Sequence, residues 1–129
     1  MSGDEISLTL PADEEFRRVA HLVLGGLAVR LDISYEALED LELALDALLE
    51  RFGTEEMITL RVQMLDEELR TVVGPFHSVR ADLADGGPDA LSLSRILGAV
   101  CDSVEIADRD DAEWVELTKR VRSEKAEAR

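Results

Sequence analysis

The first thirty residues change from one hydrophobic period to another. In "ISLTLP", residues 6–11, apolar side chains occupy every second position, which is typical of a strand with one buried face, and Pro11 ends it. Residues 13–31 then space their apolar side chains by three and four positions, with Val19 and Leu27 on the expected inner face. The sequence therefore predicts a strand followed by an amphipathic helix.

A second helix is predicted to follow directly. Ser34 is a favourable N-cap residue, because its hydroxyl can accept a hydrogen bond from a backbone N–H of the first turn. Leucines recur every third or fourth position from Leu38 to Leu48, and Phe52 continues the stripe. Gly53 stands just past the end, where a left-handed residue commonly terminates a helix.

The second half of the chain predicts two hairpins. Alternating patterns predict strands at 56–65 and 69–76, joined by a short turn, and a second pair at 102–108 and 113–120. The aspartates between the last two strands are expected to form the turn of the hairpin and not a calcium loop, since the required glycine and distal glutamate are missing.

One long loop is expected between these hairpins. Residues 77–90 contain Gly86-Gly87-Pro88 and show no sustained apolar period. A third helix is predicted beyond the loop, with Leu93, Leu97 and Val100 directed inward.

These elements predict an α+β fold, a two-layer sandwich whose mainly antiparallel sheet is covered on one face by three helices. With 129 residues and no composition shift or linker along the chain, we expect one domain over residues 1–122. Residues 123–129 are rich in charge and poor in apolar side chains, and we expect them to form a tail.

Charge and composition exclude several functions. The chain has 14 basic and 29 acidic residues and a net charge of −15, so free nucleic acid is not an expected partner. The single cysteine, Cys101, lies in an apolar stretch and is expected to be buried. His21 and His77 are too far apart in sequence to indicate a metal site. No apolar run is long enough to span a membrane and no signal peptide is recognisable, so a cytoplasmic protein is expected.

Three segments carry a resemblance to a known family. "ISLTLPADEEFRRVAHLVLGGLAVRLDISYEALEDLELALDAL", "VCDSVEI" and "WVELTKR" resemble the anti-sigma regulatory factor and serine kinase branch of the histidine-kinase-like (GHKL) ATPase superfamily. The resemblance covers nearly the whole chain and implies the sandwich fold described above. It also implies a sigma factor, or an anti-sigma antagonist, as protein partner, and it makes a homodimer possible.

The resemblance implies a catalytic pair on the second helix, which this chain does not keep. Active members carry E-x-x-x-N there, where the glutamate orients or deprotonates the nucleophile and the asparagine holds Mg²⁺. An ungapped comparison places Ala47 and Arg51 at these positions, and neither can do that chemistry. A shift by one residue supplies Asp46 and Glu50 instead, but it turns the apolar stripe of the helix away from the core.

The other nucleotide-binding elements of the family are also altered. The stretch "TVVGPF" keeps Gly74 but has no adenine-reading aspartate, and "DALSLSRIL" replaces the glycine-rich phosphate lid. Gly86 and Gly87 lie nearby, but two glycines most often form only a turn. The resemblance thus indicates a degenerate nucleotide site, without ATP, Mg²⁺ or another cofactor.

Together these features predict an anti-sigma-factor-like protein that binds a sigma factor or related regulator without ATP. Arg17, Arg18 and His21 on the first helix are the expected partner-binding residues, since an arginine at the position of Arg18 meets the sigma factor in the family. Two alternatives stay open: an ATP-dependent serine kinase that uses Asp46 and Glu50 and phosphorylates an anti-sigma antagonist, and a non-catalytic adaptor or pseudo-kinase subunit.

Overall fold

The computed structural model describes residues 5–53 and 56–120. It contains five strands and four helices in the order β1-α1-α2-β2-β3-α3-α4-β4-β5. The bounds of the elements are β1 Glu5–Pro11, α1 Glu14–Leu31, α2 Tyr35–Phe52, β2 Met57–Leu65, β3 Glu68–Phe76, α3 Val79–Asp85, α4 Pro88–Val100, β4 Ser103–Arg109 and β5 Ala112–Arg120. The predicted boundary at residue 122 and the tail 123–129 lie outside the described residues.

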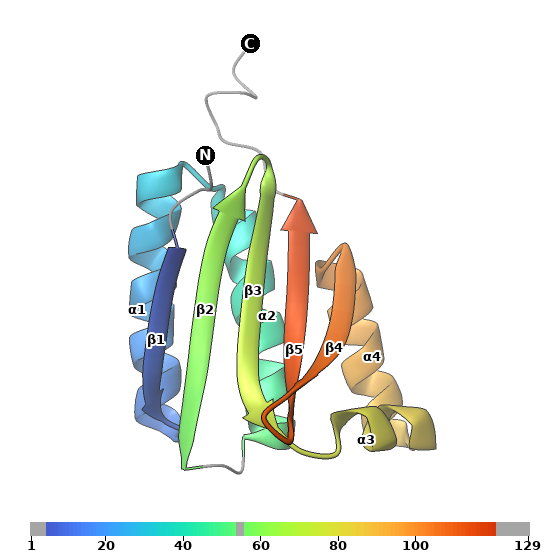
Figure 1. Cartoon of the computed structure of the whole chain (residues 1–129). Helices are drawn as coiled ribbons and strands as arrows, with labels where there is room; N and C mark the ends of the chain where they lie inside the picture. The colour runs from blue at the N-terminus through green and yellow to red at the C-terminus, as the bar shows by residue number, and fades with distance from the viewer. Residues whose placement is uncertain (1–4, 54–55, 121–129) are drawn as a thin grey trace.

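All five strands form one antiparallel sheet in the order β1-β2-β3-β5-β4. Figure 1 shows α1, α2 and α4 packed behind this sheet, with the short α3 at its lower end. The chain leaves β3, passes through α3 and α4 to the sheet edge at β4, and returns through β5 to pair with β3. The predicted two-layer α+β sandwich is therefore confirmed.

Alternation along the central strands supplies one side of the core. In β2, Ile58, Leu60 and Val62 are buried, and they lie opposite Leu10, Leu8 and Ile6 of β1 in the register of the ladder. α2 provides the other side, because its apolar stripe faces the sheet. The largest fully buried side chains are Leu24, Leu41, Leu45, Leu48, Ile58, Leu60, Val62, Val73, Phe76, Val79 and Leu117.

The caps of α2 confirm one expectation and correct another. The Ser34 hydroxyl accepts a hydrogen bond from the Ala37 N–H at 3.2 Å, as the sequence predicts. Gly53 follows the helix, but its φ of −77° is not left-handed. Its N–H instead continues the helical pattern to the Leu49 carbonyl at 2.8 Å. A Cβ on Gly53 would collide with that same carbonyl oxygen, which is why a glycine is needed there.

The inner face of α1 agrees with the prediction at Leu27 but not at Val19. Leu27 is buried, together with Ala20 and Leu24, whereas Val19 is 36 % exposed. Assigning Val19 to the core was therefore wrong, because packing against neighbouring elements selects one of two overlapping apolar stripes on this helix.

The prediction of one long loop at residues 77–90 was also wrong. α3 occupies half of this segment, and α4 begins at Pro88, still within the predicted loop. Gly86 ends α3 with a φ of +72°, a conformation that favours glycine, and Gly87 is the N-cap of α4. Proline at the first position of α4 has the φ that a helix start requires.

Candidate functional site

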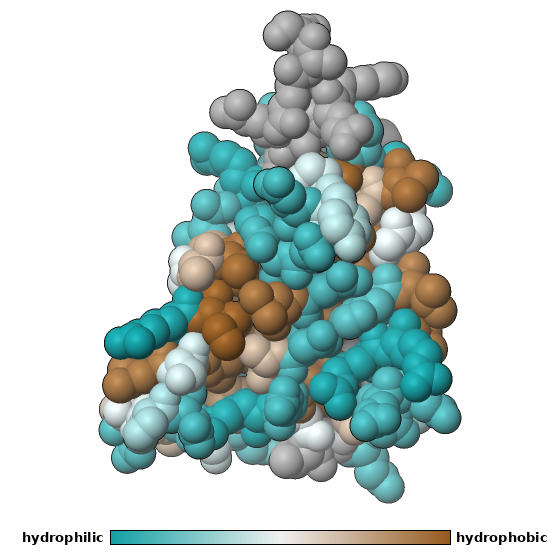
Figure 2. All heavy atoms as spheres, turned by 180° about the vertical axis from the view of Figure 1, so that it is seen from behind, coloured by the Kyte–Doolittle hydropathy of each residue, from teal (hydrophilic) through white to brown (hydrophobic). Residues whose placement is uncertain are grey.

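A pocket opens between α2 and α4 on the helical face of the molecule. Its volume is about 480 Å³, and it is lined by Ala47, Glu50 and Arg51 of α2 and by Asp89, Ser92, Leu93 and Ile96 of α4. Apolar side chains gather on this part of the helical face, to the left in Figure 2, among largely hydrophilic surroundings. The pocket therefore combines an apolar floor with a charged rim.

Arg51 crosses the rim of this pocket and is bound by acidic groups on two other helices. Its Nε and Nη2 donate to the two carboxylate oxygens of Asp82 at 2.9 and 2.7 Å, and its Nη1 lies 3.3 Å from Asp89. The hydrogen bond from Arg51 holds the pKa of Asp82 below its ordinary value, while the same bond raises the pKa of Arg51. Arg51 thus ties α2 to both α3 and α4.

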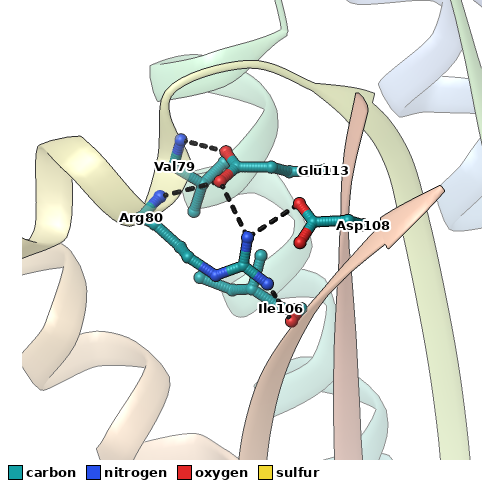
Figure 3. Close-up of polar contacts among 5 residues, drawn as sticks. All are labelled: Val79, Arg80, Ile106, Asp108 and Glu113. Carbon is teal, nitrogen blue, oxygen red and sulfur yellow. Dashed lines mark hydrogen bonds and ion pairs between the residues drawn. The ribbon is translucent and has the colours of Figure 1, made fainter. Parts of the chain in front are cut away.

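α3 owes its position to a strand residue that sequence analysis did not single out. Glu113 of β5 accepts the backbone N–H of Val79 at 2.6 Å and that of Arg80 at 3.4 Å, so it caps the helix from outside (Figure 3). Arg80 in turn contacts Asp108 at 2.7 Å and donates to the Ile106 carbonyl at 2.7 Å. This network fixes α3 on the sheet and thereby directs Asp82 toward Arg51.

The two predicted carboxylates of α2 face different directions. Asp46 lies 2.9 Å from Nε2 of His21 on α1, and Glu42 lies 3.8 Å from the other ring nitrogen. Glu50 is exposed and lines the α2–α4 pocket, from which Asp46 is absent. Ala47 and Arg51 both line this pocket. The pair given by the ungapped comparison, Ala47 and Arg51, therefore lies in one pocket, whereas the pair given by the shifted comparison, Asp46 and Glu50, does not.

The three predicted partner-binding residues of α1 do not share one exposed face. Arg18 is exposed, whereas His21 is half-buried against the carboxylates of α2. Arg17 lines a separate pocket of about 370 Å³ at the start of α1, together with Leu49, Glu50 and Gly53 of the α2 end. Arg18 is therefore the one exposed residue of the three.

Gly74 lies apart from the pocket and has a packing role. A Cβ at this position would lie 2.7 Å from the Trp114 ring, so only glycine allows β3 and β5 to pack this way. Gly86 and Gly87 form the short connection between α3 and α4, in the manner of an ordinary turn.

Other kinds of site find no counterpart in residues 5–53 and 56–120. No cluster of three or more His, Cys, Asp or Glu side chains in these ranges is arranged to hold a metal ion. Cys101 is buried, as predicted, and burial raises the pKa of its thiol to about 11. None of the helices in the same ranges combines the length and the hydropathy needed to span a bilayer.

Comparison with known proteins gives a local match. No family model matches the chain. The serine-protein kinases RsbW of Listeria monocytogenes and Listeria innocua are each 49% identical to it over 41 residues, which is 32% of this chain and 26% of theirs. The chain spans about a quarter of the length of these curated relatives. Over these 41 residues the chain is similar to proteins named as serine-protein kinases.

Proposed function

We propose that this chain is an anti-sigma-factor-like regulatory protein that binds a sigma factor, or a related transcription regulator, without ATP. The local similarity to RsbW and the antiparallel sandwich support a regulator of this kind. The main observation in favour of ATP-independent binding is the ion pair of Arg51 with Asp82, at 2.7 Å, at the rim of the pocket. In active members of the family that the chain resembles, the residue at the position of Arg51 holds Mg²⁺.

The residues of the pocket do not fit a magnesium nucleotide. A guanidinium cannot coordinate a cation, and Ala47 cannot act on a nucleophile. Glu50 and Asp89 would repel a triphosphate, since like charges at close range are unfavourable. The start of α4 offers little compensation, because Pro88 lacks an N–H and Asp89 adds negative charge in the first turn.

The proposed contact with the regulator is on α1 and centres on Arg18. This side chain is exposed, on a protein whose net charge is −15. Arg17 and His21 would contribute less, since Arg17 lines a pocket at the end of α2 and His21 pairs with carboxylates of α2. A charged residue at the margin of an interface acts mainly on the rate and specificity of association.

Thermal unfolding with and without millimolar Mg-ATP tests the nucleotide-independent part. A ligand at 100 times its dissociation constant adds about 2.7 kcal/mol to the unfolding free energy, which raises the midpoint of a domain of this size by several degrees. We expect no shift, with RsbW of Listeria monocytogenes measured in parallel as the positive control. A clear shift would refute this part of the proposal.

Co-purification with the sigma factors of the encoding organism tests the partner. We expect one of them to be retained, with weaker retention by Arg18→Glu than by the wild-type chain. Arg30→Glu, a substitution of an exposed arginine at the other end of α1, is the matched control. Retention of no sigma factor or related regulator would refute the proposed partner class.

A second candidate function is an ATP-dependent serine kinase. The observations that favour it are the 49% identity to proteins named serine-protein kinases and the exposed carboxylate of Glu50 in the pocket. Against it, Asp46 is engaged by His21 and does not line the same pocket. Phosphate transfer from labelled ATP to an anti-sigma antagonist, lost in Glu50→Gln, would favour the kinase over the binding protein.

A further inference from the structure

We propose that the groove between α2 and α4 is a docking site for a basic amphipathic helix of a protein partner. The groove is the pocket lined by Ala47, Glu50, Arg51, Asp89, Leu93 and Ile96. This inference rests on the proposed function only in assuming that the chain acts by binding another protein. The groove is a different surface from the one around Arg18 on α1.

The floor of the groove suits apolar side chains. Leu93 is buried at its base, and Ala47 is partly buried and packs against the core. Ile96 lines the groove and is half-buried. Leu43 lies one turn before Ala47 on the same side of α2 and is 50 % exposed, so the apolar strip continues beyond the pocket. A volume of about 480 Å³ admits a few such side chains, which matches a helix that inserts residues spaced by three and four positions.

The rim of the groove selects for positive charge. Among the described residues of the lining, Arg51 is the one cationic side chain, and the Asp82 carboxylate that accepts its two hydrogen bonds balances its charge. Asp89 is 83 % exposed, and Glu50 is exposed without an ion-pair partner in the part of the chain that the structure describes. Asp82 and Asp89 pair with the guanidinium, and Glu50 adds a third carboxylate to the rim, so acidic groups outnumber basic ones there. This excess of negative charge repels phosphate groups and attracts lysine or arginine.

Ion pairs hold the walls of the groove in place. At one end Arg51 joins α2 to α3 and α4. At the other end Lys119 of β5 donates to the Val100 carbonyl of α4 at 2.8 Å and lies 3.1 Å from Asp40 of α2. Because the helices are fixed before a ligand arrives, little ordering entropy is lost on binding.

Fluorescence anisotropy with a synthetic peptide tests the proposal on the full chain. The probe is a labelled helical peptide with leucines at positions i, i+3, i+4 and i+7 and lysines elsewhere. Its counterpart has glutamates in place of the lysines. We expect the lysine peptide to bind and the glutamate peptide not to bind, with affinity falling as salt is raised.

Two charge-reversal variants locate the binding site. Glu50→Lys should weaken binding of the lysine peptide at least about tenfold, because it places a like charge at the rim. Glu105→Lys changes the net charge equally on exposed β4, outside the groove, and should leave the affinity within about twofold of wild type. Ile96→Ala, which keeps all charges, should weaken binding several-fold through lost apolar contact.

The possible outcomes separate this inference from the proposed function. No binding, or equal weakening by both lysine substitutions, would overturn the groove as a specific site. If sedimentation shows a dimer that Glu50→Lys dissociates, a second copy of the chain occupies the groove and the inference is also overturned. Stabilisation by Mg-ATP, or failure to retain any sigma factor, would refute the proposed function and leave the peptide result standing.

Discussion

Removal of the Glu113 carboxylate should loosen α3 and lower the stability of the whole domain. This side chain is 15 % exposed and accepts hydrogen bonds from the backbone N–H groups of Val79 at 2.6 Å and Arg80 at 3.4 Å. It also forms an ion pair with Nη1 of Arg80 at 3.5 Å. Ser78 is the N-cap residue of α3 by position, but its side chain makes no capping hydrogen bond. In Glu113→Ala the N–H of Val79, a residue 1 % exposed, therefore loses its acceptor.

The expected cost follows from two overlapping effects. Loss of a helix N-cap costs about 0.5–2 kcal/mol. Leaving a buried donor without an acceptor costs about 1–3 kcal/mol. Because both describe the same hydrogen bonds, they are not added, and we expect Glu113→Ala to lower the unfolding free energy by about 2 kcal/mol. For a domain of this size that corresponds to a drop of roughly 6–9 °C in the thermal midpoint.

Chemical and thermal unfolding followed by circular dichroism measure this change. Glu113→Gln keeps one acceptor oxygen and should lose about half as much stability. Glu105→Ala, on exposed β4, is the control and should change the unfolding free energy by less than about 0.5 kcal/mol. Hydrogen exchange should accelerate over α3 in Glu113→Ala. A loss no larger than that of the control, or unchanged exchange in α3, would refute the capping role.

Three further predictions concern packing and ionisation. Gly74→Ala places a Cβ 2.7 Å from the Trp114 ring and should lower the unfolding free energy by about 1–3 kcal/mol. Gly98→Ala, with no atom within 4 Å of the new Cβ, should raise the unfolding free energy by roughly 0.5–1 kcal/mol. Denaturant unfolding measures both changes, and the opposite order would refute the packing argument. Because the pKa of Cys101 is raised to about 11, iodoacetamide at pH 8 should alkylate the native thiol far more slowly than the unfolded one, and equal rates would contradict its burial. Because Arg51 lowers the pKa of Asp82, their pair contributes stability that is full above the ordinary value of 3.8 and is lost as pH falls through the lower folded-state pKa. An NMR titration should show that this pKa rises in Arg51→Ala, and an unchanged value would rule out the pairing.

Elements with a long, regular hydrophobic period were predictable from sequence. α2 has five turns with one apolar stripe, and Ser34 marks its start, so both its existence and its buried face followed from the pattern. The alternation in β2 likewise identified its inner residues. In α1 two apolar stripes overlap, and the exposure of Val19 (36 %) follows from packing contacts that no local pattern contains.

The candidate site depends on contacts between distant segments. Seven residues are too few for a helical period, and α3 is held by Glu113, which lies 34 residues from Val79 in the chain. Proline after two glycines was the available sign of a helix end followed by a helix start. Asp82 and Asp89 had no sequence feature that linked them to Arg51, because ion pairing across helices depends on their placement.

The sequence by itself determined the α+β class and the strands of both hairpins, since hydrophobic periodicity is a local property. Only the tertiary structure decided that Ala47 and Arg51 share one pocket with Glu50, while Asp46 is directed to His21. It also decided the charge of that pocket, because the number of carboxylates around Arg51 is set by how α2, α3 and α4 pack on the sheet.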